Sequence, residues 1–183
     1  YESINNQPTM LAERAYSPWL DMEKALREND IPLYALESKK PLLSFDIIGF
    51  TLPYETLYTN ALNILDLAKI PLHAANRDDS HPLIISGGHS SYNPEPFAPF
   101  MDAILLGEGE EIMLEVISAF QQWKKQKQSR QNLLESISKI PGVYVPSFYL
   151  PDYHSDGTIR EIKPQNDHAT HKITKRIMGK LPL

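Results

Sequence analysis

The sequence predicts a doubly wound α/β fold, in which short buried strands alternate with helices around a mainly parallel sheet and a β-hairpin follows. Two apolar runs, residues 83–85 and 103–106, each stop at glycine, which is typical of buried parallel strands. Apolar residues at helical spacing occur at residues 57–68 and again at 112–120. Asp156-Gly157 lies between two further strand-like runs, as in a hairpin turn. This order favours right-handed crossovers between parallel strands, closed by a β appendage.

The composition is that of an ordinary globular domain. With 183 residues, 42% of them hydrophobic and 22% charged, the chain can bury the core of one domain with an appendage. Its net charge of −5 gives no attraction to nucleic acid or to an anionic membrane surface. No apolar run approaches the roughly 20 residues that span a bilayer, and no signal peptide is visible. We therefore expect a cytoplasmic protein without a membrane partner.

Cysteine is absent from the sequence. The chain therefore has no disulfide framework, no thiolate metal site and no thiol nucleophile of its own. The first residue is Tyr1 rather than methionine, and no strand precedes the first helical signal. We expect the chain to be a piece of a longer protein.

The first elements are expected in the amino-terminal quarter of the chain. Ser17, as N-cap, and Pro18, at the first helical position, predict a helix that ends at Asn29-Asp30. Its apolar residues follow helical spacing: Trp19, Met22, Ala25 and Leu26. Residues 31–36 form an apolar run that predicts a short strand, broken by Lys39-Lys40-Pro41.

The middle of the chain carries the strongest periodic signals. Residues 45–52 (FDIIGFTL) predict a strand that is apolar on both faces and ends at Pro53. The amphipathic helix over residues 57–68 follows, and Pro71 closes it. Between the two strands that end in glycine, three prolines leave room for only about one helical turn. They are Pro94, Pro96 and Pro99.

A long helix is expected after Gly109. Carboxylates lie in its first turns and lysines at its far end, which suits the helix dipole. A shorter helix over residues 133–140 ends at Pro141-Gly142. Residues 143–150 then alternate as a strand that Pro146 and Pro151 confine to an edge, and residues 158–162 return as its partner.

These signals divide the chain into three parts. Residues 1–140 are expected to form the α/β domain and residues 141–163 the hairpin appendage. Residues 164–183 show little periodicity and an excess of lysine and arginine, Lys180 included, which predicts a linker. Because few aromatic residues accompany these charges, we interpret the tail as a solvated linker rather than as an RNA-binding segment.

The loop Ser86-Gly87-Gly88-His89-Ser90-Ser91 has two interpretations. It follows a predicted parallel strand, and open α/β sheets bind ligands at the carboxyl ends of their strands. Glycine lets backbone N–H groups come close to a ligand, because no Cβ intervenes. The alternative is a tight strand-to-helix turn without a ligand. The residues alone favour neither interpretation.

The loop Gly107-Glu108-Gly109-Glu110-Glu111 resembles the start of a dinucleotide-binding fingerprint. The third glycine of that fingerprint is missing, and three carboxylates would repel a pyrophosphate. We therefore exclude a nucleotide phosphate as its ligand. The alternative is an acidic helix start after a strand.

Asp152 to Gly157 spell D-x-H-x-x-G, the motif by which some cobalamin proteins supply a histidine as the lower cobalt ligand. That motif belongs directly after the first strand of the sheet, whereas here it falls on a late hairpin. We interpret it as turn chemistry and expect no metal ligand there. For His168 and His171 the alternatives are a weak surface metal site and solvated side chains, and we expect solvated side chains. No serine–histidine–acid arrangement is recognisable.

Three segments together resemble the cobalamin-binding domain that precedes the catalytic barrel in B12-dependent radical S-adenosylmethionine (SAM) proteins. They are FDIIGFTL, with Asp46 to Thr51; PLIISGGHSSYNPEPF, with Gly87-Gly88 to Pro94-Glu95; and DAILLGEGEEIMLEVI, with Asp102 to Glu110. The segments ERAYSPWLDMEKAL and IPLYALES are similar to a subgroup of uncharacterised radical SAM proteins with an amino-terminal B12-type domain. The resemblance covers residues 10–183.

The resemblance implies a flavodoxin-like or Rossmann-like sheet of the B12-binding type, although the first strand of that fold is not found here. It implies that the corrin and the nucleotide tail of cobalamin lie at the carboxyl edge of the sheet. Glycines would admit the tail, and polar side chains would bond the corrin amides or the tail. No histidine ligand to cobalt is expected from this domain. The residues implied in cofactor binding are Thr51, Tyr54, Gly87, Gly88, His89, Ser90, Gly107, Glu108 and Gly109.

The radical chemistry of the resembled family uses a Cys-x3-Cys-x2-Cys motif on the barrel that follows. Without cysteine, this chain holds neither the 4Fe-4S cluster nor S-adenosylmethionine, which the resemblance assigns to a barrel of the same polypeptide. The chain alone is therefore not expected to be an enzyme, and the barrel is its expected partner. An alternative is a vestigial B12-type fold that acts only as a structural or docking domain. The unusual His89 and the missing early histidine motif motivate this alternative.

Overall fold

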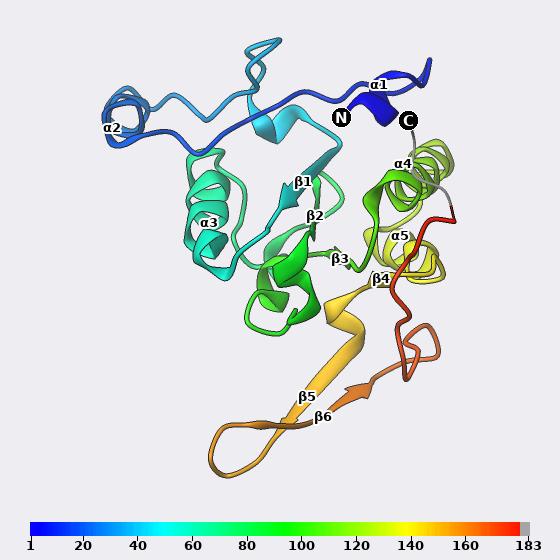
Figure 1. Cartoon of the computed structure of the whole chain (residues 1–183). Coiled ribbons are helices and arrows are strands. Elements are labelled where there is room, and N and C mark those ends of the chain that lie inside the picture. The colour runs from blue at the N-terminus through cyan, green and yellow to red at the C-terminus, as the bar shows by residue number, and fades with distance from the viewer. Residues whose placement is uncertain (180–183) are drawn as a thin grey trace.

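The computed structural model describes residues 1–179 and contains two separate sheets (Figure 1). The main sheet has the order β1-β2-β3-β4, and β5 pairs only with β6. Its first three strands are parallel, and the last is antiparallel to β3. They are β1 (Ile47–Thr51), β2 (Leu83–Gly87), β3 (Ala103–Leu105) and β4 (Val143–Tyr144). The predicted α/β fold with a mainly parallel sheet and a later antiparallel hairpin is confirmed.

Five α-helices and several short 3-10 turns connect these strands within residues 1–179. The helices are α1 (Glu2–Asn5), α2 (Leu20–Glu28), α3 (Tyr58–Leu67), α4 (Gly109–Gln126) and α5 (Arg130–Ile137). The 3-10 turns are Leu42–Ser44, Glu55–Leu57, Ala74–Asn76, His89–Tyr92, Ala98–Phe100 and Pro146–Phe148. None of the helices described for residues 1–179 is long and apolar enough to cross a bilayer.

The central strand β2 is buried on both faces, which explains its unbroken apolar run. Leu83 and Ile85 belong to a core cluster with α4 and α5, whereas Ile84 belongs to a second cluster with α3. Figure 1 shows α3 on one side of the sheet and α4 with α5 on the other. The helix α4 contributes Ile112 and Val116 to its cluster, as their helical spacing predicts.

Two predictions for the amino-terminal quarter are wrong. The helix α2 begins at Leu20 rather than directly after Ser17, and Trp19, its N-cap, is 78% exposed. Of the four residues predicted for its apolar face, only Leu26 is buried. The helix instead contacts α3 through polar groups, because Arg27 forms an ion pair with Asp66 at 2.7 Å.

The predicted strand over residues 31–36 is also wrong. Its only ladder contact among the described residues is an isolated bridge between Tyr34 and Pro41. Leu33 is buried, and its backbone is held on both sides. Its N–H donates to Leu67 O at the end of α3 at 2.9 Å, and its carbonyl accepts the N–H of Leu42 at 2.9 Å. The apolar run therefore packs as an irregular segment against α3.

The expected strand over residues 45–52 is confirmed in shortened form as β1, but β1 pairs only with β2 and is partly exposed. The strand predicted over residues 143–150 is divided in two. Residues Val143–Tyr144 join the main sheet, and the turn at Pro146 separates them from β5 (Tyr149–Tyr153). A proline has no N–H to donate to a ladder, so the strand breaks there.

The hairpin of β5 and β6 (Ile159–Pro164) projects from the main body (Figure 1). Its predicted turn at Asp156-Gly157 is confirmed. Gly157 has a positive φ of 84°, and the Asp156 carboxylate accepts the Thr158 N–H at 2.9 Å. Glycine suits this backbone conformation because it has no Cβ.

A buried charge cluster, which we call the Asp102 staple, holds the amino-terminal edge of the sheet. Asp102 is 4% exposed and directly precedes β3. Its carboxylate accepts the N–H of Ile84 in β2 at 2.7 Å. It also forms ion pairs with Arg130 at 2.7 Å and with Arg77 at 3.2 Å.

The two arginines of the Asp102 staple bind the surrounding loops. Arg77 donates to the carbonyl of Phe100 at 2.8 Å and to those of Pro71 and Leu72. Arg130, at the start of α5, donates to the carbonyl of Pro82 at 2.8 Å and to those of Asp78 and His81. Backbone groups that would otherwise lack partners are thereby satisfied in the protein interior.

We predict that Asp102→Asn lowers the free energy of unfolding by about 3–5 kcal/mol, because two buried guanidinium groups lose their counter-charge. Urea unfolding measures the change. Asp152→Asn is the matched control, since Asp152 pairs with Lys163 at the surface at 3.0 Å and such pairs contribute about 0–1 kcal/mol. Equal effects of the two substitutions would contradict the role of the staple.

Candidate functional site

The carboxyl ends of the three parallel strands lie side by side. Their register aligns Thr51 of β1 with Gly87 of β2, and Gly87 with Leu105 of β3. The loops that follow these strands therefore leave the sheet at one edge, where open α/β sheets bind ligands.

The loops after β1 and β2 are joined by backbone contacts at Gly88. The carbonyl of Leu52 accepts the N–H of Ser90 at 3.1 Å and its hydroxyl at 2.7 Å. Gly88 has a φ of +109°, and a Cβ at this position would lie 2.6 Å from the Leu52 oxygen. The tight-turn interpretation thus accounts for glycine at this position.

The loop after β3 contacts a segment from the end of the described chain. We call residues 173–178 the strap. The N–H of Arg176 donates to Leu106 O at 2.8 Å, and the N–H of Glu108 donates to Arg176 O at 3.1 Å. The Glu108 carboxylate also accepts the N–H of Met178. The strap falls within the segment predicted as a linker, of which residues 180–183 lie outside the described residues.

Gly107 allows this close approach. Its φ is +108°, and a Cβ would lie 2.6 Å from Arg176 N and even closer to the carbonyl oxygen of the same residue. The backbone of the strap therefore occupies the space that the missing Cβ leaves open.

A crevice of about 390 Å³ lies between these loops. One wall comes from the loop after β2, the second from the loop after β3, and the strap closes the third side. Lys175 of the strap lies above the ring of Tyr92, 5.9 Å from its centroid. The lining residues are Gly88, His89, Tyr92, Gly107, Glu108, Lys175, Arg176 and Ile177.

Four of the nine predicted cofactor-binding residues line this crevice, namely Gly88, His89, Gly107 and Glu108. The other five do not. Tyr54 is 67% exposed, and Thr51 is exposed at the end of β1. Ser90 is buried and bonded to Leu52, Gly87 pairs within the sheet, and Gly109 begins α4.

The lining residues that sequence reasoning missed are Tyr92 and the three residues of the strap. The strap carries no periodic signal, and its partner loop lies far away in the sequence. The signal available in the sequence was the glycine at position 107, which permits close approach of another backbone.

Glu95 of the Pro94-Glu95 motif has a structural role. Its carboxylate accepts the hydroxyl of Tyr144 in β4 at 2.5 Å. Burial, together with this carboxylate, raises the pKa of Tyr144 above its ordinary value, so the phenol remains a donor. The pair connects the loop after β2 to the edge strand β4.

The D-x-H-x-x-G sequence forms the turn of the projecting hairpin. The N–H of His154 donates to Thr158 O at 2.8 Å, and Asp152 is paired with Lys163 and Arg160. Within residues 1–179, no group of three or more histidine, aspartate or glutamate side chains has the arrangement of a metal site.

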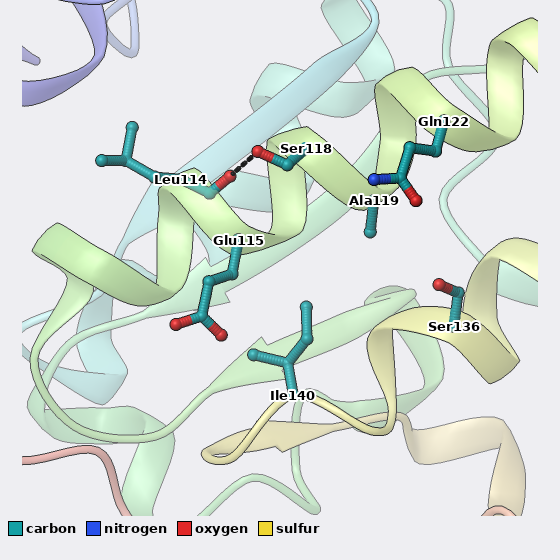
Figure 2. Close-up of a pocket in the computed structure, with 7 residues that line it drawn as sticks. All are labelled: Leu114, Glu115, Ser118, Ala119, Gln122, Ser136 and Ile140. Carbon is teal, nitrogen blue, oxygen red and sulfur yellow. Dashed lines mark hydrogen bonds between the residues drawn. The ribbon is translucent and has the colours of Figure 1, made fainter.

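A second depression lies on the outer side of α4, against the segment that ends α5 (Figure 2). Two of its polar groups are engaged elsewhere: the Ser118 hydroxyl donates to Leu114 O within the same helix at 2.7 Å, and Glu115 forms an ion pair with Arg176 of the strap. Glu115 is the only charged residue among the lining residues, so the depression offers no cluster of charged groups to a ligand. Its lining is Leu114, Glu115, Ser118, Ala119, Gln122, Ser136 and Ile140.

Comparison with known proteins gives one family and one relative. Residues 1–146 match the family described as "Radical SAM proteins, N-terminal". The chain is 33% identical over 96 residues to the uncharacterized protein MJ0966 of Methanocaldococcus jannaschii. This alignment covers 50% of the chain and 20% of the relative, so the chain matches about a fifth of that protein's length. No solved structure matches the chain.

We predict that Gly88→Ala destabilises the protein by about 1–3 kcal/mol, because the new Cβ requires a strained backbone and meets Leu52 O. Gly109→Ala is the control, since a Cβ there meets nothing within 4 Å and alanine favours the helix. Thermal unfolding of the two variants provides the comparison. A Gly88→Ala variant as stable as the control would show that the contact with Leu52 O does not require glycine at position 88.

Proposed function

The chain belongs to the family of N-terminal domains of radical SAM proteins, and on that premise we propose that it is the cobalamin-binding module of a radical SAM enzyme. The corrin and its nucleotide tail bind at the carboxyl edge of a doubly wound sheet of the B12-binding type. When bound, cobalamin supplies the chemistry of its cobalt centre. The observation that carries the proposal is the crevice between the loops after β2 and β3.

The groups around the crevice fit part of cobalamin. His89 and Tyr92 supply hydrogen-bonding groups on one wall, and Glu108 supplies an acceptor on the other. In the same 3-10 turn, Ser91 is 4% exposed and its hydroxyl has no partner among the described residues, but Ser91 does not line the crevice. A buried polar atom without a partner is unusual, and a buried water would satisfy it.

The size of the crevice limits what it holds. A volume of about 390 Å³ is near the lower end for small-molecule pockets. We therefore assign it to the base and sugar of the nucleotide tail. The corrin ring and the phosphodiester of the tail, which the Glu108 carboxylate would repel, remain outside the crevice. Of the nine residues implied by the resemblance, those of the crevice walls are the ones we retain for binding: Gly88, His89, Gly107 and Glu108.

The proposed partner is a radical SAM barrel in the same polypeptide. The chain has no cysteine, so the 4Fe-4S cluster and S-adenosylmethionine belong to that barrel in this proposal. The family match is consistent with such a fusion. The role of this chain is to bind and orient the corrin, while the radical reaction takes place on the barrel.

A second candidate function is a structural or docking domain that binds no cobalamin. One observation favours it: the spaces beside Gly88 and Gly107 are filled by the backbone of Leu52 and Arg176. Both glycines are then needed for packing of the chain upon itself, without any ligand.

We predict that the protein retains hydroxocobalamin on gel filtration and that His89→Leu weakens binding about ten-fold, the effect of one lost hydrogen bond. Equilibrium titration followed by corrin absorbance measures the affinity. The matched control is His154→Leu in the hairpin turn, which we expect to leave the affinity unchanged.

Absence of any retained corrin would exclude the cobalamin proposal and leave the docking domain. Loss of binding in His154→Leu, with His89→Leu unaffected, would instead assign the ligand to the D-x-H-x-x-G turn. Either result would contradict our assignment of the crevice.

A further inference from the structure

We propose that the strap, docked on Gly107 between the crevice and Glu115, is an autoinhibitory lid that must leave before cobalamin reaches the Gly107–Glu108 wall. This inference rests on the proposed function. It concerns the regulation of the same site and follows from which backbone groups the strap occupies.

The strap uses the polar groups that form one wall of the proposed site. Arg176 bonds the carbonyl of Leu106 and the N–H of Glu108 through its own backbone. The Glu108 carboxylate is engaged by the N–H of Met178. A ligand and the strap therefore cannot use these groups at the same time.

Two glycines beneath Arg176 make the seat for the strap. Gly107 and Gly142 both have a positive φ, of 108° and 92°. A Cβ on Gly142 would lie 2.8 Å from Leu106 O and 3.3 Å from Arg176 N. A side chain at position 107 would displace the strap, whereas one at position 142 would collide first with Leu106 O and would make only a tight contact with Arg176 N.

The strap is nevertheless held by few contacts. Lys175 and Ile177 are exposed, the latter by 65%. Besides the bridge to Gly107, its side-chain contacts are the packing of Ile173 at the edge of the core, the ion pair of Arg176 with Glu115, and Lys175 above the ring of Tyr92. Segments with exposed backbone bonds and little buried apolar surface open at low free energy.

Glu115 is a latch that lies outside the crevice. It belongs to α4 and lines the depression of Figure 2, whereas the crevice lining does not include it. Its side chain is 44% exposed. Glu115→Gln thus removes the charge that holds Arg176 and leaves every group of the proposed binding site in place.

The test compares strap opening with ligand affinity in the same protein. Trypsin cleavage after Lys175 and Arg176, followed by mass spectrometry, reports the open population when opening is faster than cleavage. Hydroxocobalamin titration reports the apparent dissociation constant, which is inversely proportional to the fraction of molecules with an open strap. The two measurements must therefore change by the same factor if the strap is a lid.

We expect Glu115→Gln to accelerate this cleavage about two- to five-fold, the range for a surface ion pair, and to tighten hydroxocobalamin binding by the same factor. The control is Glu111→Gln, an exposed carboxylate one turn earlier on α4, which changes neither quantity. Arg176→Gln removes one of the two trypsin sites, so all variants are compared by cleavage after Lys175 alone. By that measure Arg176→Gln must reproduce the effect of Glu115→Gln, and the double variant must add nothing further.

The outcomes separate the lid from the proposed function. Faster cleavage with unchanged or weaker corrin binding would contradict the inference that the strap is a lid. The strap would then be a wall of the binding site. Unchanged cleavage in both single variants would show that the ion pair of Glu115 with Arg176 does not hold the strap in place. If no variant binds hydroxocobalamin although cleavage is faster, the proposed function itself fails.

Discussion

One buried carboxylate organises the amino-terminal edge of the sheet. Asp102 accepts a backbone bond from β2 while it stands at the start of β3, so it aligns the two strands directly. Arg77 and Arg130 balance its charge and, through their remaining donors, hold the loops that lead into both strands. Since the register of paired strands is the same along their length, this alignment also places the loops at the opposite, carboxyl edge, where Gly87 pairs with Leu105.

The carboxyl edge is held by contacts of a different kind, between backbone and backbone. Gly88 admits Leu52, and Gly107 admits Arg176. Glycine loops after parallel strands usually indicate space for a ligand, but here the chain itself fills much of that space. What is left is the crevice between the two loops. A ligand on the Gly107 side therefore competes with the strap. Binding of the ligand and undocking of the strap are then coupled in one equilibrium.

The parts of the fold that sequence predicted well are those with local causes. The strand β2 is apolar because both of its faces are buried, and α4 shows its buried stripe at helical spacing. The run at residues 31–36 was mispredicted because a distant partner determines it: the N–H of Leu33 donates to Leu67 O at the end of α3. The strap escaped prediction for the same reason, since its seat at Gly107 lies in a different part of the chain.

Hydrogen–deuterium exchange of the protein with and without hydroxocobalamin tests the central claim, that the carboxyl-edge crevice binds cobalamin. The account predicts slower exchange at residues 88–92, together with faster exchange at Arg176 and Met178 as the strap is displaced. The amide of Ile84, bonded to the Asp102 staple at the other edge, should remain unchanged. Protection confined to the hairpin around His154, or no change anywhere in the described chain, would contradict it.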